Sequence, residues 1–197
     1  MMLIEQTTVP NAALPVQEFK QHLRLGTGFA DDDLQDGVLE SFLRAALAAV
    51  EARTGKAVIV RDFRWELTAW RDLSRQVLPI APVSAISGLV ITDQQGVDEV
   101  IDPSRYRLEP DMHRPKLVAS GLVLPVIPVG GMAAISFTAG FGASWGAVPA
   151  DLAQAVMLLA ARFYEQRGLV GEAAIPASVE SLLARFRVIR LFGGGVS

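Results

Sequence analysis

A strand, a glycine-rich turn, a proline and a long alanine-rich helix follow one another between residues 133 and 168, and this succession limits the possible folds strongly. Apolar and small residues alternate over 134–138 with the period of a β-strand, until Gly140 interrupts the pattern. Pro149 can occupy the first turn of a helix, and Asp151 places a negative charge near the positive end of its dipole. The stretch therefore predicts a strand that leads through a tight turn into a helix.

The helix predicted over 150–167 is apolar on almost every side. One stripe at helical spacing consists of Leu152, Ala155, Val156, Leu159, Ala160 and Phe163. Three further residues extend the apolar character beyond this stripe: Met157, Leu158 and Ala161. A helix that is apolar all round is normally buried on two sides, so we expect one side to contact a neighbouring subunit.

Length and composition fit one compact domain with extensions, or at most two small domains. Of the 197 residues, 51% are hydrophobic and 20% are charged, so the chain can bury a sizeable core. The net charge of −3 gives no global attraction to nucleic acid. The absence of cysteine excludes disulfides, thiolate metal sites and cysteine nucleophiles, and it fits a reducing compartment.

The sequence predicts a soluble protein that neither spans a membrane nor is exported. A spanning helix needs about 20 unbroken apolar residues, and the apolar stretch 121–129 is broken by Pro125 and Pro128. The N-terminus lacks the basic start and apolar core of a secretory signal.

Two helices are predicted at the beginning of the chain. The first starts at Pro15, and its apolar face consists of Val16, Phe19 and Leu23. The second is capped by Asp31, Asp32 and Asp33 and stops at Gly55. Its apolar positions at helical spacing are Leu34, Val38, Phe42, Ala45, Ala46 and Ala49.

From residue 63 onward the hydrophobic period becomes that of β-strands. The alternation over 63–69 is typical of a strand with one face in water. Further strands are predicted over 77–80, 86–92, 106–109, 116–119 and 132–138. Their short spacing favours antiparallel hairpins, one of which would carry Asp98 and Glu99 in its turn. We therefore expect an α+β, mainly helical fold, with N-terminal helices, a small antiparallel β meander, a long buried helix and a C-terminal helical arm.

The C-terminal end combines a small-residue connector over 168–176 with a short helix capped by Ser178. The apolar face of this helix consists of Val179, Leu182, Leu183 and Phe186, and its basic residues are Arg185, Arg187 and Arg190. An end that is apolar, basic and weakly tethered is a candidate docking arm. The alternative is a helix packed on its own domain with a frayed tail.

No arrangement of residues predicts catalysis, a metal site or a cofactor. The glycines at 140, 142 and 146 superficially resemble a dinucleotide-binding turn, but the helix starts only after the last glycine and no strand follows it. His22 and His113 lie far apart and lack partners for a catalytic role. Asp36 and the aspartates before it are better explained as helix-capping residues than as a calcium loop.

The three tryptophans are better explained by packing than by stacking on single-stranded nucleic acid, because basic residues are not interleaved around Phe141 and Trp145. Trp65 and Trp70 are expected in a core or an interface. Trp145 lies in the glycine-rich loop, where we expect it to contact another subunit.

Several short motifs occur in a characteristic order: EARTGK at the end of a helix, a Trp-containing strand, LPIAPV, SRYRLEP, TAGFG and VPADLAQAVMLLAARFYEQRG. This order resembles the head-to-tail connector, or adaptor, family of tailed phages and gene transfer agents, from residue 16 to residue 186. One departure is the ending over 164–168, which replaces an Asn-Arg-Glu-like ending and leaves the helix intact.

The resemblance implies a structural protein of the virion neck that is not an enzyme. About a dozen copies would form a homo-oligomeric ring below the portal protein, continue the DNA channel and support the next neck or tail (stopper) protein, after assembly in the bacterial cytoplasm. It implies a core domain over 1–175 and a docking arm over 176–197 that reaches the portal. The portal-docking residues would be Val179, Leu182, Leu183, Arg185, Phe186, Arg187, Arg190 and Phe192. The subunit-interface residues would be Trp145, Met157, Leu158 and Ala161.

A mildly acidic chain suits DNA that passes through a lumen without specific binding, since each neutralised phosphate would add affinity. Two alternatives to the adaptor remain at this stage. One is a neck or tail-completion protein that caps the tail tube, and the other is a small-molecule-binding or enzymatic domain that uses the loop over 140–146.

Overall fold

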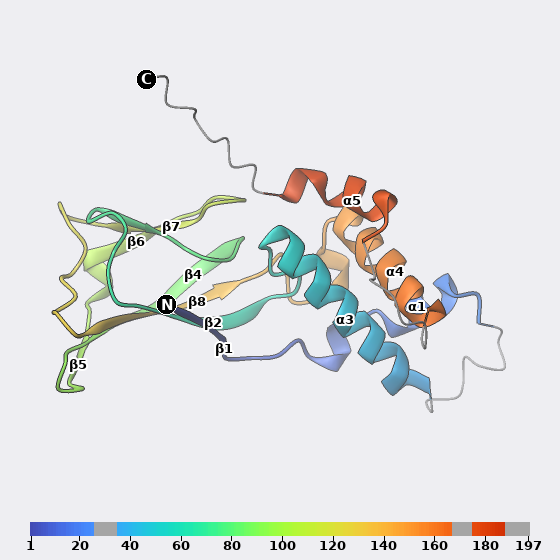
Figure 1. Ribbon diagram of the computed structural model, residues 1–197, viewed down its shortest axis with the longest axis horizontal. Coiled ribbons are helices and arrows are strands. Elements are labelled where there is room, and N and C mark those ends of the chain that lie inside the picture. The colour runs from blue at the N-terminus through green and yellow to red at the C-terminus, as the bar shows by residue number, and fades with distance from the viewer. Residues whose placement is uncertain (26–34, 167–174, 188–197) are drawn as a thin grey trace, which may run out of the picture.

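The computed structural model describes residues 1–25, 35–166 and 175–187. Helices gather at one end of the long axis of the molecule and β-sheets form the other end (Figure 1). The predicted α+β class and the antiparallel pairing of the strands are confirmed.

The helical layer contains four described α-helices: α1 (Val16–His22), α3 (Asp36–Thr54), α4 (Ala150–Glu165) and α5 (Ala177–Leu183). Short 3-10 turns occur at Asn11–Ala13, Pro103–Arg105, Trp145–Ala147 and Ala184–Phe186. Helix α3 ends as predicted at Gly55, which has a left-handed φ of 67°. The aspartates predicted to cap this helix, 31–33, lie outside the described residues. Pro149 precedes the first residue of α4 as its N-cap rather than lying inside the first turn.

The buried face of α3 differs from the predicted one. Of the predicted apolar positions, Ala46 is buried, Phe42 and Ala49 are half-buried, and Val38 (47%) and Ala45 are exposed, while Leu34 lies outside the described residues. The other residues of α3 that enter the core are Leu39, Leu43, Leu47 and Val50. The predicted stripe and the buried stripe are neighbours on the helix and share Ala46. The stripe with the leucines is the more buried one, because it faces α1 and α4.

The strands form two antiparallel sheets. The first contains β1 (Met2–Glu5), β2 (Arg61–Leu67), β8 (Met132–Ala139), β4 (Val83–Thr92) and β5 (Asp98–Val100) in the order β1-β2-β8-β4-β5. The second contains β3 (Arg75–Val77), β7 (Lys116–Ala119) and β6 (Tyr106–Glu109) in the order β3-β7-β6. The bounds predicted for β6 and β7 are confirmed.

The strand order corrects the predicted meander, because β8 lies between β2 and β4 instead of at the end of a sequential sheet. Strand β1 precedes the helices and was not predicted; it pairs with β2 at one edge of the five-stranded sheet. Asp98 and Glu99 belong to β5 and not to the turn, which is formed by residues 93–97.

Two hydrophobic clusters hold the structure together. The helical cluster joins the helices α1, α3, α4 and α5, and it includes Phe19, Leu43, Leu159 and Leu183. The sheet cluster includes Phe63 and Phe137, whose rings stack with their centroids 5.7 Å apart. Trp65 is buried in this cluster, and the Trp70 indole N–H donates to the Pro125 carbonyl at 2.7 Å. The packing role predicted for these two tryptophans is therefore confirmed.

A buried arginine ties the helical layer to the sheet. The Arg61 side chain is 7% exposed, and one terminal nitrogen donates to both Glu51 carboxylate oxygens at 2.7 Å. Its other terminal nitrogen lies 3.2 Å from the Glu5 carboxylate. Charge-assisted bonds of this kind are among the stronger hydrogen bonds. They fix strands β1 and β2 against α3.

Candidate docking site

The C-terminal helix α5 packs onto its own chain. It starts directly after Pro176, so Ser178 is an exposed residue inside the helix and does not cap it. The side chains of Val179, Leu183 and Phe186 are buried in the helical cluster. Helix α5 lies beside α4 in the helical layer (Figure 1). Burial of three large apolar side chains fixes this segment firmly.

Two sets of ion pairs flank α5. The Arg185 guanidinium binds the Asp151 carboxylate in the first turn of α4, with nitrogen–oxygen distances of 2.5 and 2.9 Å. Glu180 accepts from Arg53 of α3 at 2.8 Å and from Arg187 at 3.1 Å. These side chains are partly exposed, so each pair contributes at most about 1 kcal/mol. Their effect is mainly to orient the segment.

The same segment contacts the glycine-rich loop that follows β8. The Phe141 and Phe186 rings meet edge to face, with their centroids 6.0 Å apart and their planes at 86°. The Arg185 guanidinium lies 4.6 Å from the centre of the Phe186 ring. Phe186 thus joins the C-terminal segment to the loop.

These contacts correct part of the predicted docking arm. Val179, Leu183 and Phe186 face the chain's own core, because their stripe matches the apolar surface of α4, and Leu182 is half-buried. Over 177–186 the structure therefore has the alternative arrangement, a helix packed on its own domain. Arg185 and Arg187 are exposed. The predicted docking residues Arg190 and Phe192 lie outside the described residues.

The residues predicted at a subunit interface have unequal access to a neighbour. Met157 and Ala161 are only 8% and 9% exposed within the single chain. Leu158 and Trp145 are half-buried against the helical cluster. Helices α1, α3 and α5 thus cover much of the apolar surface of α4. A subunit contact at these four positions stays a prediction, with more open surface at Leu158 and Trp145.

The glycines of the loop after β8 serve close packing. Gly140 has a φ of 138°, and a Cβ built there would lie 2.5 Å from the Val60 backbone. A Cβ at Gly142 would overlap the Ala147 methyl group. The Gly140 N–H donates to the Pro82 carbonyl at 2.9 Å, and the Val60 N–H donates to the Gly142 carbonyl at 2.9 Å. Unlike a dinucleotide-binding turn, this loop lies between antiparallel strands and a helix capped by proline.

Replacing Gly140 by alanine is expected to lower the free energy of unfolding by about 2 kcal/mol or more, because the added methyl group meets backbone atoms and the φ is strained. Gly146→Ala is the matched control, since no atom lies within 4 Å of its Cβ position. Urea unfolding of both variants measures the difference. Equal stability of the two variants would contradict the packing role of Gly140.

A group of charged side chains near His113 holds two parts of the described chain together. Lys56 is fully buried, and its ammonium donates to the Met112 carbonyl at 2.5 Å and lies 3.3 Å from His113 Nδ1. Burial lowers the pKa of the Lys56 amine, and the nearby Asp111 carboxylate partly opposes this shift. The backbone N–H groups of Arg114 and His113 lower the pKa of Asp111. The contacts attach the β6–β7 turn to the end of α3.

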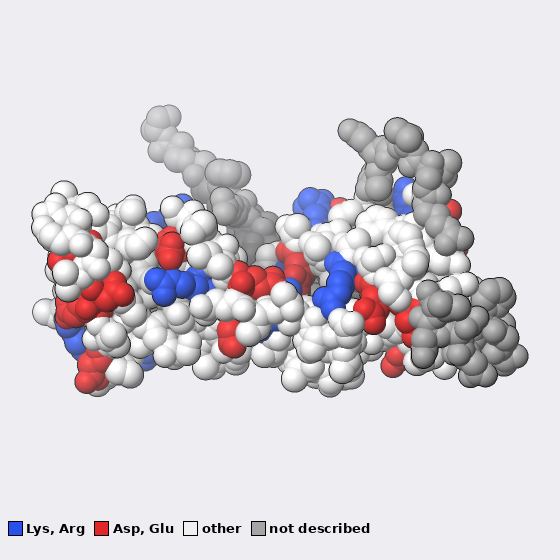
Figure 2. Space-filling view, turned by 90° about the horizontal axis from the view of Figure 1, so that it is seen from below, with Lys and Arg blue, Asp and Glu red and all other residues white. Residues whose placement is uncertain are grey.

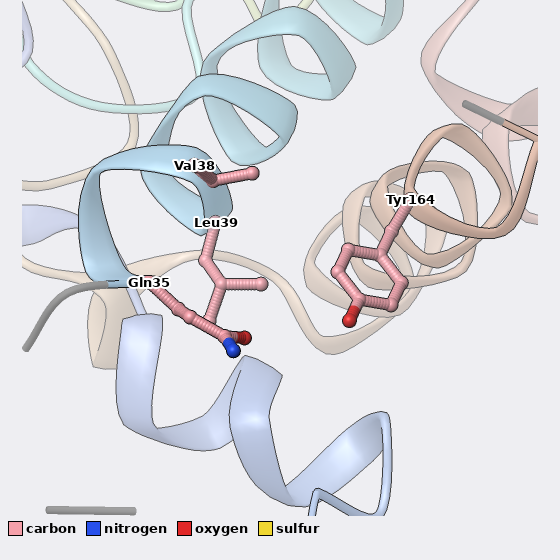
Figure 3. Close-up of a pocket in the computed structure, with 4 residues that line it drawn as sticks. All are labelled: Gln35, Val38, Leu39 and Tyr164. Carbon is pink, nitrogen blue, oxygen red and sulfur yellow. The ribbon is translucent and has the colours of Figure 1, made fainter. Parts of the chain in front are cut away.

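A pocket of about 250 Å³ lies between the start of α3 and the end of α4 (Figure 3). It is lined by Gln35, Val38, Leu39 and Tyr164. The Tyr164 ring points toward α3 and meets the Phe42 ring edge to face at 5.9 Å. None of these four lining residues, within the part of the chain that the structure describes, carries a carboxylate, an amine or an imidazole.

Among the described residues there is no group of three His, Cys, Asp or Glu side chains that could hold a metal ion. A search of the same residues finds no helix with the length and apolar character needed to cross a membrane.

No protein-family model and no curated protein matches the chain. Three solved structures match 98% of this chain and 99% of their own. The neck of an empty gene transfer agent (GTA) particle computed with C6 symmetry matches at 55% identity with a TM-score of 0.90. A chain from the virion of a native GTA particle matches at 56% identity with a TM-score of 0.88. A chain from the neck of a native GTA particle computed with C12 symmetry matches at 52% identity with a TM-score of 0.85.

The fold and these matches define a structural protein of a phage-like virion. At more than 50% identity over nearly the whole length, the chain belongs to the family of GTA particle neck proteins. The predicted membership of the phage and GTA neck class is confirmed at this level.

Proposed function

We propose that the chain is the head-to-tail connector (adaptor) of a gene transfer agent or phage-like particle, forming a ring below the portal that continues the DNA channel and joins head to tail. The observation that carries this proposal is the near full-length similarity to chains of GTA necks. Necks computed with C6 and with C12 symmetry are both compatible with a ring of about twelve copies, since a twelvefold ring contains sixfold symmetry.

Ring closure requires two different, complementary surfaces on each copy. The half-buried side chains of Leu158 and Trp145 are candidates for one subunit contact in the helical layer, together with the small open parts of Met157 and Ala161. The edge strands β1 and β5 leave backbone hydrogen-bonding groups unpaired within the sheet and can contribute further contacts. The net charge of −3 favours passage of DNA over binding.

The portal contact is assigned to the segment 176–197, in a form refined by the packing of α5. Buried Val179, Leu183 and Phe186 serve as the anchor on the helical layer. The part that reaches the portal then consists of the exposed Arg185 and Arg187 and the residues after them, with Arg190 and Phe192. The contact with the stopper protein is left to the other surfaces of the chain.

A neck or tail-completion protein that caps the tail tube is the second candidate, since the similarity is to necks in general. The small-molecule alternative has less support, because Gly140 and Gly142 of the loop over 140–146 pack closely against the chain's own Val60 backbone and Ala147.

Co-sedimentation with DNA-filled, tailless heads from the same source tests the proposal. We expect the purified chain to bind these heads and imaging to reveal a symmetric ring of added density below the portal. Isolated tail tubes serve as the control partner. Binding to tail tubes but not to heads would replace the adaptor by the tail-completion protein, and binding to neither would refute both.

A further inference from the structure

Large apolar side chains are exposed together at the end of the molecule that is formed by the sheets. They come from the turn before β3, from the β4–β5 hairpin and from the loop that joins β7 to β8, at the end opposite the helical layer (Figure 1). Their exposed fractions range from 52% to 96%. This tip surface consists of Leu73, Val97, Val100, Leu122, Val123, Val126 and Val129. Several exposed apolar side chains at one end of a folded protein favour an interaction site there.

The loop that carries most of the tip surface is held from its inner side. The Leu124 N–H donates to the Leu73 carbonyl at 2.7 Å, and Leu124 is 2% exposed. The Trp70 indole N–H bonds to Pro125 in the same loop. At its other end the loop lies against Gln94 of the β4–β5 turn, next to Gly130. The exposed valines and Leu122 are therefore presented on an anchored backbone, which lowers the entropy lost on binding.

Carboxylates lie among the exposed valines of the β4–β5 hairpin. Asp93, Asp98 and Glu99 belong to it, and none of the three forms an ion pair within the described part of the chain. The sequence has no lysine or arginine over 76–104 or over 117–161, and the arginines nearest in sequence to the tip residues are Arg71 and Arg75 on either side of Leu73, and Arg105. Red acidic atoms are prominent at the sheet end of the molecule in Figure 2, with fewer blue basic atoms beside them. The hairpin side of the tip surface is thus apolar and negatively charged.

We propose that the tip surface docks the neck protein on the tail side, through an apolar patch on that partner bordered by lysine and arginine. The inference rests on the proposed adaptor function, because that function assigns the portal contact to Arg185, Arg187 and the residues after them, which follow α5. Helix α5 lies at the helical end of the long axis and the tip surface at the other (Figure 1). Charge complementarity selects a basic partner. A second copy bound tip to tip would instead place carboxylates against carboxylates.

The test uses full-length chains on tailless heads, followed by addition of isolated tails and a count of tailed particles by electron microscopy. The tip variant is Val126→Asp with Val129→Asp, at side chains that are 79% and 96% exposed. The control is Val38→Asp with Met112→Asp, which changes two exposed apolar residues away from the tip surface, 47% and 51% exposed. We expect unchanged melting and head binding for both, and about tenfold fewer tailed particles for the tip variant alone.

A second variant tests the charges. Asp98→Asn with Glu99→Gln is expected to slow tail joining and to weaken its dependence on salt.

Normal tail joining by the tip variant would overturn the inference. Loss of ring formation or head binding by that variant would also overturn it, by assigning the surface to another copy or to the portal. If the unmodified chain does not bind heads, the adaptor function itself fails, and that result is distinct from both.

Discussion

Leu159→Arg is expected to leave the helical layer unfolded or close to unfolding. The Leu159 side chain is 1% exposed in the centre of α4, within the cluster that joins all four described helices. Loss of a buried leucine costs about 2–5 kcal/mol, and an unpaired buried charge adds several kcal/mol. The sum approaches the whole stability of a typical domain, about 5–15 kcal/mol. Thermal melting by circular dichroism and the yield of soluble protein measure the effect.

Gln154→Arg is the matched control, because Gln154 is an exposed residue of the same helix. It adds the same charged side chain and is expected to change stability by less than about 0.5 kcal/mol. Normal melting and normal assembly of the Leu159 variant would mean that this side chain faces water, in contradiction to the packing described above.

Local periodicity identified the elements whose boundaries are marked by turn residues. Strands β6 and β7 begin and end where predicted, because Pro103, Pro110 and Pro115 separate their alternating patterns. In α4 five of the six residues of the predicted stripe are buried and Phe163 is half-buried. Spacing of 3.6 residues determines which side chains share a face, and that information is entirely local.

Features that depend on distant partners could not be predicted in the same way. Helix α3 offers two adjacent apolar stripes, and only the packing of α1 and α4 against it selects the one with Leu39 and Leu43. The four residues of β1 lack a strong pattern of their own and form a strand because β2 provides an edge. The place of β8 between β2 and β4 is likewise set by tertiary pairing.

The candidate site shows the same limit. The spacing of Val179, Leu183 and Phe186 indicated an apolar face, and the face exists. Its partner could have been another protein or the chain's own helical layer, and periodicity does not distinguish the two. The edge-to-face contact between Phe141 and Phe186 joins residues far apart in the sequence, so single-sequence patterns do not reveal it.

Two C-terminal deletions are expected to separate folding from docking. Removal of residues 176–197 takes away the buried side chains of Val179, Leu183 and Phe186 and exposes the apolar surface of α4 beneath them. Each such side chain contributes about 1.5–3 kcal/mol, so this deletion is expected to cost about 5 kcal/mol or more and to yield aggregated or molten protein. Urea unfolding and size-exclusion chromatography measure the loss.

Removal of residues 188–197 alone keeps the anchor of α5, the Arg185–Asp151 pair and the Glu180 pairs. This shorter deletion is expected to melt like the full chain and yet to lose binding to DNA-filled heads, because Arg190 and Phe192 are removed. The comparison assigns any loss of head binding to docking and not to unfolding. Normal head binding by the shorter variant would exclude 188–197 from the portal contact and leave the exposed Arg185 and Arg187 as its remaining candidates in this segment.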